Sequence, residues 1–297
     1  MDANLFVQLA VNGLIVGALY GVVALSFVLI YKASQVVNFA QGEFVLIGAW
    51  TCWWLLASLH LPFAAAFLCT LAFMLAFGLV LQVAVLRPMI GEPAISVIMM
   101  TIGLAMFLQA LMKWVFGVSA QPFPSIFTTP SLNVLGLEVR TVYVMSTLAS
   151  IATMVGFGWF FKFSRMGLAM RATAFNQQAA QSLGISTRKV FALSWAISAM
   201  VSGLAGVVVG VVNGVSPALS LFGIKVFPAV ILGGLDSIVG AIVGGLVIGV
   251  LENLAHFADS QFLRWGNLYE IAPFYVLIAI LLVRPYGLFG TREIERV

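Results

Sequence analysis

The sequence predicts an all-α protein, a polytopic bundle of membrane-spanning helices with about eight or nine spans, one of them broken or re-entrant. First, 62% of the 297 residues are hydrophobic and only 8% are charged, with a mean hydropathy of +1.12, which is too much apolar surface for one soluble core. Second, apolar runs recur at lengths near the roughly 20 residues that cross a bilayer as a helix. Third, the strict period-2 alternation of a transmembrane barrel is absent.

Nine apolar runs are the candidate spans. In chain order they cover residues 5–30, 37–59, 62–86, 94–116, 142–161, 190–212, 226–235, 238–254 and 271–283. The run at 226–235 is too short to cross alone as an untilted helix, so we expect half of a broken helix or a re-entrant element there. The first run follows no basic n-region and is too long for a signal peptide, so we expect it to be retained as a span.

The positions of lysine and arginine predict the orientation, because these residues gather in short cytoplasmic loops. Placing the N-terminus outside assigns the connections at Lys32 and Arg87, the segment 162–189 and the tail after Arg284 to the cytoplasm. The dispersed cations and the formal net charge of +4 are better explained by membrane orientation than by a nucleic-acid partner, so we expect contact with lipid and none with nucleic acid.

Glycines four residues apart predict close helix packing. Such series are Gly13, Gly17 and Gly21; Gly206, Gly210 and Gly214; and Gly240 and Gly244, with Gly245 and Gly249 one residue out of phase. Small residues on one face let two helix backbones approach closely in lipid. We favour static packing over a surface that slides during transport, since this spacing is common in membrane helices.

Polar residues stand at the start of the second predicted span, in the stretch "NFAQGEF". They are Asn38, Gln41 and Glu43, with Gly42 between the last two. A carboxylate at membrane depth is costly unless it is solvated or paired. Two interpretations remain open for Glu43 and its neighbours: a place at the membrane interface, or a role in the translocation path or at a helix break of the kind transporters use.

A second interruption is predicted in the stretch "PAVILGGLDSIVG". Pro228, Gly233, Gly234 and Asp236 lie between two short apolar runs. Proline removes a backbone donor and glycine weakens a helix, so we expect a break whose backbone groups find partners in protein or water. We favour Asp236 as the N-cap of the next helix over a direct contact of Asp236 with substrate.

The polar, basic stretch "RATAFNQQAAQSLGISTRK" at 171–189 lies between two apolar spans and contains no acidic residue. At helical spacing Phe175, Ala179 and Leu183 share one face, while Asn176 lies elsewhere. Gly184 is well placed to end the helix in the left-handed conformation. A short amphipathic helix at the cytoplasmic surface follows, and its face of alanines and one phenylalanine suits docking to a soluble partner better than lipid anchoring.

The stretch "QAAQSLG" resembles the EAA-x3-G loop of ATP-binding cassette (ABC) importer permeases. The Glu of that pattern is Gln178 here, its alanines are Ala179 and Ala180, and its glycine is Gly184, while its apolar-x-Leu-Pro tail is missing. With "NFAQGEF", "VSGLAGVVVG", "AVILGGLDSIVGAIVGGLVIGVLE" and "RPYGLFG", the chain is similar nearly end to end to the branched-chain amino acid ABC transporter permeases of the LivH type, in the LivH/LivM family.

That resemblance implies a subunit of an importer in the bacterial inner membrane, multi-pass, with a cytoplasmic C-terminus, moving leucine, isoleucine or valine. Residues 1–297 would form one permease domain with a cytoplasmic coupling loop at 164–190. The implied partners are a LivM-type second permease, two cytoplasmic ATP-binding subunits and a periplasmic or lipoprotein solute-binding protein. Any ATP and magnesium would bind the ATPase subunits, so this chain is expected to hold no cofactor and to be no enzyme.

The residues themselves agree with that division of labour. The chain has no G-x-x-x-x-G-K-[ST] phosphate loop, and neither its two histidines nor its two cysteines stand at metal-ligand spacing. Two other functions remain open. One is a related ABC permease for urea or short amides; the other is a secondary transporter driven by an ion gradient, with Glu43 and Asp236 as cation sites. A membrane scaffold without transport is a third.

Overall fold

The computed structural model describes residues 3–89, 91–126, 131–134, 137–264, 266 and 268–291. The α-helices are α1 (Ala3–Ser34), α2 (Gln41–Ala57), α3 (Phe63–Leu81), α4 (Ala94–Phe116), α5 (Thr141–Phe163), α6 (Arg165–Phe175), α7 (Gln177–Ser182), α8 (Thr187–Asn213), α9 (Leu221–Gly233), α10 (Ile238–Ala258) and α11 (Leu268–Val283). Short π or 3-10 segments are η1 (Gln82–Leu86), η2 (Arg87–Met89), η3 (Pro217–Ser220) and η4 (Asp259–Leu263). A small antiparallel hairpin pairs β1 (Ser131–Val134) with β2 (Leu137–Arg140).

Each of the nine predicted spans contains a helix, which confirms the all-α membrane bundle. Within the described part of the chain, six helical stretches are long and apolar enough to cross a membrane. They are Val11–Ser34, Phe63–Met89, Ala94–Phe116, Thr141–Phe163, Thr187–Asn213 and Ile238–Phe262. The helices α2, α9 and α11 account for the other three runs and have only 17, 13 and 16 residues.

The glycine series of α1 packs closely, as its spacing predicted, and the structure shows that its partner is α10. A Cβ on Gly13 would lie 2.7 Å from Val250 Cα, and one on Gly17 would lie 2.7 Å from Leu246 Cα. The two helices are antiparallel, because positions rising along α1 meet positions falling along α10. Backbones that touch at this distance leave no space for a side chain, so glycine is required along this contact.

The out-of-phase glycines of α10 serve two different neighbours. Gly245 and Gly249 face α1, where an added Cβ would lie 2.6 Å or less from backbone atoms of Gly21 or Gly17. Gly244 faces α9, where an added Cβ would lie 2.1 Å from the carbonyl oxygen of Ala229. Because of the one-residue offset, α10 packs closely against α1 on one side and against α9 on the other.

The helices α2 and α8 form the second close contact. A Cβ on Gly48 would lie 2.3 Å from Gly203 Cα, and one on Gly206 would lie 2.0 Å from the carbonyl oxygen of Val45. Most residues of α1 and α8 are buried inside the chain, whereas only 28% of those in the spanning windows of α3, α4 and α5 are buried. The glycine contacts thus build a tight centre, and the outer helices present apolar faces outward.

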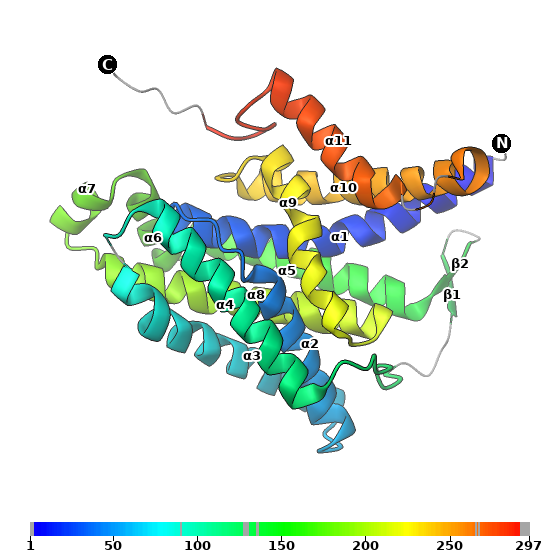
Figure 1. The fold of residues 1–297 in the computed structure, drawn as a ribbon, viewed down its shortest axis with the longest axis horizontal. Helices are drawn as coiled ribbons and strands as arrows, with labels where there is room; N and C mark the ends of the chain where they lie inside the picture. Colours follow the sequence, from blue (N-terminus) through cyan, green and yellow to red (C-terminus); the bar gives the residue numbers. More distant parts are fainter. Residues whose placement is uncertain are drawn as a thin grey trace.

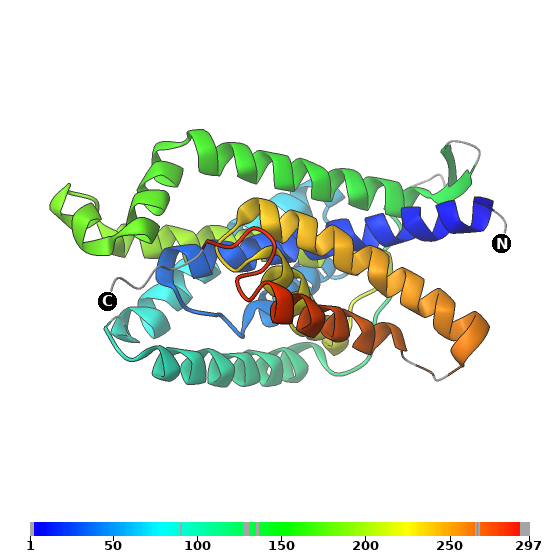
Figure 2. The same ribbon diagram turned by 90° about the horizontal axis from the view of Figure 1, so that it is seen from above.

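The two ends of the bundle carry different elements. In Figures 1 and 2, α6 and α7 lie at one end, while the hairpin β1–β2 and the start of α1 lie at the other. Four basic connections predicted to share one side of the membrane do lie together. The connection at Lys32, the segment 162–189 and the tail after Arg284 meet at one pocket, which is lined by Lys32, Arg171 and Pro285. The connection at Arg87 meets the first two at a second pocket, which is lined by Ser34, Met89 and Gln177.

Candidate functional site

The polar stretch at 171–189 forms two helices, α6 and α7, instead of the single helix that its periodicity predicted. The chain bends at Asn176, whose Oδ1 accepts a hydrogen bond from the Ala179 backbone N–H at 2.9 Å and caps α7. Asparagine prefers this N-cap position because its side chain satisfies a helix N–H that has no backbone partner. The competing cap outweighs the continuous apolar periodicity and breaks the helix.

The three residues predicted to form the docking face are all exposed, but so are Asn176, Gln177 and Gln181, so exposure does not single out one face. Phe175 and Leu183 are 95% and 80% exposed, and Ala179 is exposed between them in sequence. Ala180, by contrast, is buried. One alanine of the motif therefore anchors α7, while its neighbour is available to a partner, as are the exposed side chains of Asn176 and Gln178.

Gly184 ends α7 as predicted. Its φ of 82° is in the left-handed region, which costs glycine little. The N–H of Gly184 donates to the Gln181 carbonyl and the N–H of Ile185 donates to the Ala180 carbonyl, at 2.9 and 3.0 Å. This is the Schellman arrangement, which satisfies the last carbonyls of the helix and fixes the direction in which α7 leaves toward α8.

Arg171 attaches this pair of helices to the membrane bundle. Its guanidinium donates to the carbonyl oxygens of Phe161 and Lys162 at the end of α5. Its charge also lies 5.6 Å from the centre of the Phe161 ring. The pair α6–α7 is thus held against α5 by Arg171 and is joined to α8 by the chain itself.

The turn between α9 and α10 forms the second predicted interruption, and one of its assignments was wrong. Ser237, not Asp236, caps α10, since its side chain accepts from the Gly240 N–H at 3.0 Å. The carboxylate of Asp236 instead accepts hydrogen bonds from the backbone N–H and the hydroxyl of Thr291. The shorter serine side chain directly before the helix caps it, and the C-terminal segment binds the aspartate.

The same turn shows where the helix really breaks. Pro228 lies inside α9, which continues to Gly233, and the break comes at Gly234 with a φ of 106°. As expected for a break, other backbone groups pair with those at the helix end. The N–H groups of Leu288 and Phe289 donate to the carbonyls of Leu232 and Gly233 at 2.8 and 3.0 Å.

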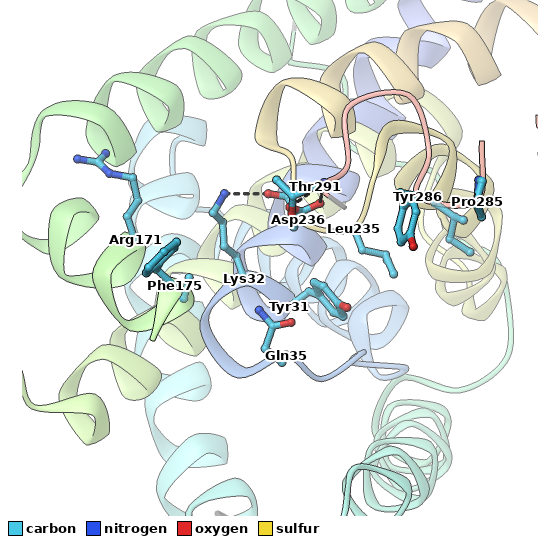
Figure 3. A pocket seen from close by; sticks show the side chains of 12 residues that line it. Tyr31, Lys32, Gln35, Arg171, Phe175, Leu235, Asp236, Pro285, Tyr286 and Thr291 are labelled. Carbon is cyan, nitrogen blue, oxygen red and sulfur yellow. Dashed lines mark hydrogen bonds between the residues drawn. The ribbon is translucent and has the colours of Figure 1, made fainter. Parts of the chain in front are cut away.

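A pocket of about 540 Å³ lies beside this turn, at the end of the bundle that carries α6. Figure 3 shows Lys32 of α1 reaching across it to Asp236, whose backbone carbonyl accepts from the lysine Nζ at 2.8 Å. Arg171 and Phe175 line the pocket from α6, and Tyr286 and Thr291 line it from the C-terminal segment. The pocket is therefore the place where α1, α6 and the C-terminal segment meet.

At the other predicted interruption, the start of α2 is buried, and the side-chain amide of Gln41 there has hydrogen-bond partners for both its nitrogen and its oxygen. The Nε2 of Gln41 lies within hydrogen-bond reach of the hydroxyls of Ser26, Ser198 and Ser202, and Gln41 Oε1 accepts from Asn38 at 2.9 Å. All five residues are at most 1% exposed. This cluster, the Gln41 cluster, joins α1, α2 and α8 through polar groups that satisfy one another.

Glu43 lies two residues further along and has a different environment. It is 6% exposed, and its Oε2 accepts no hydrogen bond. Its neighbours are the hydroxyl of Ser220 in η3 and the charge of Lys113 on α4. The side chain is therefore enclosed by this chain, and both interpretations of Glu43, a place at the membrane interface and a role in the translocation path or at a helix break, stay predictions.

Gly42 explains why Glu43 and Ser220 meet. A Cβ on Gly42 would lie 2.1 Å from the Ser220 carbonyl oxygen, and a Cβ on Gly223 would lie 2.6 Å from Gly42 Cα. The start of α2 therefore lies directly against η3 and the start of α9. Ser220 in turn accepts from Gln109 Nε2 at 3.1 Å, and Gln109 Oε1 accepts from Lys113 at 3.1 Å. Glu43, Ser220, Gln109 and Lys113 are called the Glu43 cluster below.

Several of these residues were missed from the sequence. Ser198 and Ser202 stand four apart in an apolar span, a spacing that places two hydroxyls on one helix face and was a usable signal. Gln109 and Lys113 also stand four apart in an apolar span, whereas Ser26 gave no such signal, since it is a single polar residue in an apolar run. Among the described residues, no group of three or more His, Cys, Asp or Glu side chains is placed to hold a metal ion.

Comparisons with known proteins agree with this architecture. Residues 9–283 match the family model described as the branched-chain amino acid transport system / permease component. The chain is 31% identical over 306 residues to the high-affinity branched-chain amino acid transport system permease protein LivH of Salmonella typhimurium, covering 98% of both chains. It is 32% identical over 309 residues to the corresponding protein BraD of Pseudomonas aeruginosa, again covering 98% of each.

Two further comparisons are more distant. The ribose import permease protein RbsC of Haemophilus influenzae is 29% identical over 177 residues, which cover 57% of this chain and 48% of that protein. Among solved structures, a chain of PsaBC from Streptococcus pneumoniae in complex with Fab superposes with a TM-score of 0.51. It covers 95% of this chain and 92% of that one at 16% identity, so it supports the fold alone.

Proposed function

The chain belongs to the family of branched-chain amino acid transport system permease components, and from that premise we propose that it is the permease subunit of an ABC importer for leucine, isoleucine and valine. The full-length similarity to LivH and BraD supports the substrate class. The observation that carries the mechanism is the exposed pair α6–α7 at one end of the bundle, where Phe175, Ala179 and Leu183 are uncovered.

In this mechanism the permease itself hydrolyses nothing. An ATP-binding subunit in the cytoplasm receives α7 in a surface groove, and its closure on ATP moves α7. The Schellman turn at Gly184 passes the movement to α8, and Arg171 passes it to α5. A second, LivM-type permease completes the pathway, a second ATPase docks on that permease, and a binding protein delivers the amino acid at the opposite end. ATP and magnesium are held by the ATPases.

This assignment places the end with α6, α7 and the C-terminal segment in the cytoplasm of a bacterium and the start of α1 outside the inner membrane. The basic residues gathered at the α6–α7 end support that sidedness through the positive-inside rule. Partial similarity to a ribose permease keeps other small solutes as alternatives, among them urea and short amides. A gradient-driven transporter is the alternative that needs no ATPase at all.

The test is co-purification of the tagged chain with the ATPase subunits of its own transporter, comparing wild type with Ala179→Arg. A long cation on the exposed face of α7 should abolish capture of the ATPase by steric and charge effects, while the chain itself still folds. The matched control is Ser119→Arg, an exposed position beyond α4, which should leave capture unchanged. Full capture by Ala179→Arg, or no capture by the wild type, would contradict the proposal.

A further inference from the structure

The Glu43 cluster contains an acid whose charge the described chain does not neutralise by an ion pair. Among the described residues Glu43 forms no ion pair, whereas Lys225 pairs with Glu252 and Glu270 at 3.5 and 3.9 Å. Lys113 interacts with Glu43 electrostatically, but its ammonium group donates a hydrogen bond to Gln109 Oε1 at 3.1 Å. A buried carboxylate with an oxygen that accepts nothing is costly in a membrane protein, and such residues mark solute pathways.

The position of Glu43 at the start of α2 explains how a buried acid is tolerated there, but it does not explain the function of the acid. Glu43 lies in the first turn of α2, where the positive end of the helix dipole stabilises a negative charge. Short helices that begin inside a membrane protein with their N-termini toward a solute are a recurring feature of transporters. The dipole acts through space, however, and leaves Glu43 Oε2 without a hydrogen-bond donor.

The cluster lies at the margin of the chain and not in its centre. Leu221, directly after Ser220, is 50% exposed, and Met106, one turn before Gln109 on α4, is 70% exposed. Lys113 is exposed as well. Glu43 and Ser220 are themselves only 6% and 7% exposed, so they lie just behind this margin, whose apolar side chains suit an aliphatic group.

We propose that Glu43 binds the ammonium group of the transported amino acid, with Ser220 and Gln109 supplying the neighbouring polar contacts. The inference rests on the proposed transport function and adds to it a site within this chain. An ammonium group offers three N–H donors and a positive charge, which is what an unpaired carboxylate oxygen lacks. Lys113 supplies a positive charge on the same side for the amino acid's own carboxylate.

The first experiment measures leucine taken up per ATP hydrolysed, in proteoliposomes that contain the complete transporter. The isosteric change Glu43→Gln should lower this ratio by at least about tenfold, since a charge-assisted hydrogen bond to the cargo is lost. Glu43→Asp keeps the charge and should recover part of the ratio. Glu92→Gln, an exposed acid before α4, is the matched control and should transport like wild type.

The outcomes separate this inference from the proposed function. If the wild-type complex takes up no leucine on ATP, the transport function fails, whatever Glu43 does. If the wild type transports and Glu43→Gln transports the same amount of leucine per ATP, the binding role is overturned while the function stands. Equal purification yields of the assembled complex for both variants exclude a folding defect as the cause of a lower ratio.

A second experiment reads the site without transport. In a complex whose Cys52 and Cys69 are replaced by serine, Ser220→Cys is treated with a cationic and with an anionic methanethiosulfonate. The cationic reagent should react faster, leucine should slow it, and adding Glu43→Gln should remove the preference, because the carboxylate attracts cations. A cysteine at 220 that reacts with neither reagent, or with both at rates independent of Glu43 and leucine, would overturn the proposal.

Discussion

Two polar clusters lie two residues apart on α2 and have opposite characters. Around Gln41 every member bonds to another, and the amide bridges α1, α2 and α8 at no more than 1% exposure. Around Glu43 the carboxylate has an oxygen that accepts nothing, and its neighbours Gln109 and Lys113 pair with each other. We call the Gln41 cluster closed, because its polar groups hydrogen-bond to one another, and the Glu43 cluster open, because one carboxylate oxygen has no hydrogen-bond donor.

The contrast teaches how to separate structural from functional polarity inside a membrane protein. A saturated network stabilises the helices it joins, because breaking it would leave polar groups without partners in an apolar medium. An unpaired acid contributes no comparable stability and is a reason to look for a ligand. Gln41 should therefore matter for stability and Glu43 for transport, and the following predictions try to break that division.

The largest expected effect comes from the glycine contact between α8 and α2, the helix that carries Gln41 and Glu43. A side chain on Gly206 would start 2.0 Å from the Val45 carbonyl oxygen, and a backbone atom cannot move aside. Gly206→Leu should cost more than about 4 kcal/mol and leave little monodisperse protein on size-exclusion chromatography. The control is Gly156→Leu in α5, where an added Cβ meets nothing within 4 Å; equal loss in both variants would mean that the packing is not specific.

The second-largest effect is expected when the hydrogen bonds of the Gln41 cluster are removed. Gln41→Leu removes the donor shared by three serines and the acceptor of Asn38, so it should cost about 2–3 kcal/mol and lower the thermal unfolding midpoint in detergent. Gln178→Leu, an exposed glutamine on α7, provides the matched control and should leave the midpoint unchanged. A wild-type midpoint for Gln41→Leu would show that the cluster does not stabilise the bundle.

Much of the fold could be predicted because hydropathy and glycine spacing report directly on lipid contact and helix packing. The series at Gly13 and Gly245 indicated close packing, and the structure pairs them in an antiparallel contact. Their partner helices could not be predicted, because a repeat of small residues shows that a helix packs closely without showing against which one. The bend at Asn176 was missed for a related reason, since periodicity does not weigh a competing cap.

The candidate site was predictable only in part. Polar residues in an apolar span singled out Gln41 and Glu43, but sequence gave no means of telling them apart, because the difference lies in residues far along the chain. Ser198 and Ser202 satisfy Gln41, and Ser220 lies against Glu43. Asp236 was misassigned because its partner, Thr291, lies 55 positions away, beyond the reach of any local capping rule.

The most direct test of the division between the clusters is the thermal unfolding midpoint of Glu43→Gln measured beside that of Gln41→Leu. Removing an unpaired buried acid should leave the Glu43→Gln midpoint at or slightly above that of the wild type, since the cost of burying the charge disappears. The Gln41→Leu midpoint should fall in the same experiment. If Glu43→Gln falls as far as Gln41→Leu, the acid is a structural group like its neighbour, and the distinction between a closed and an open cluster is wrong.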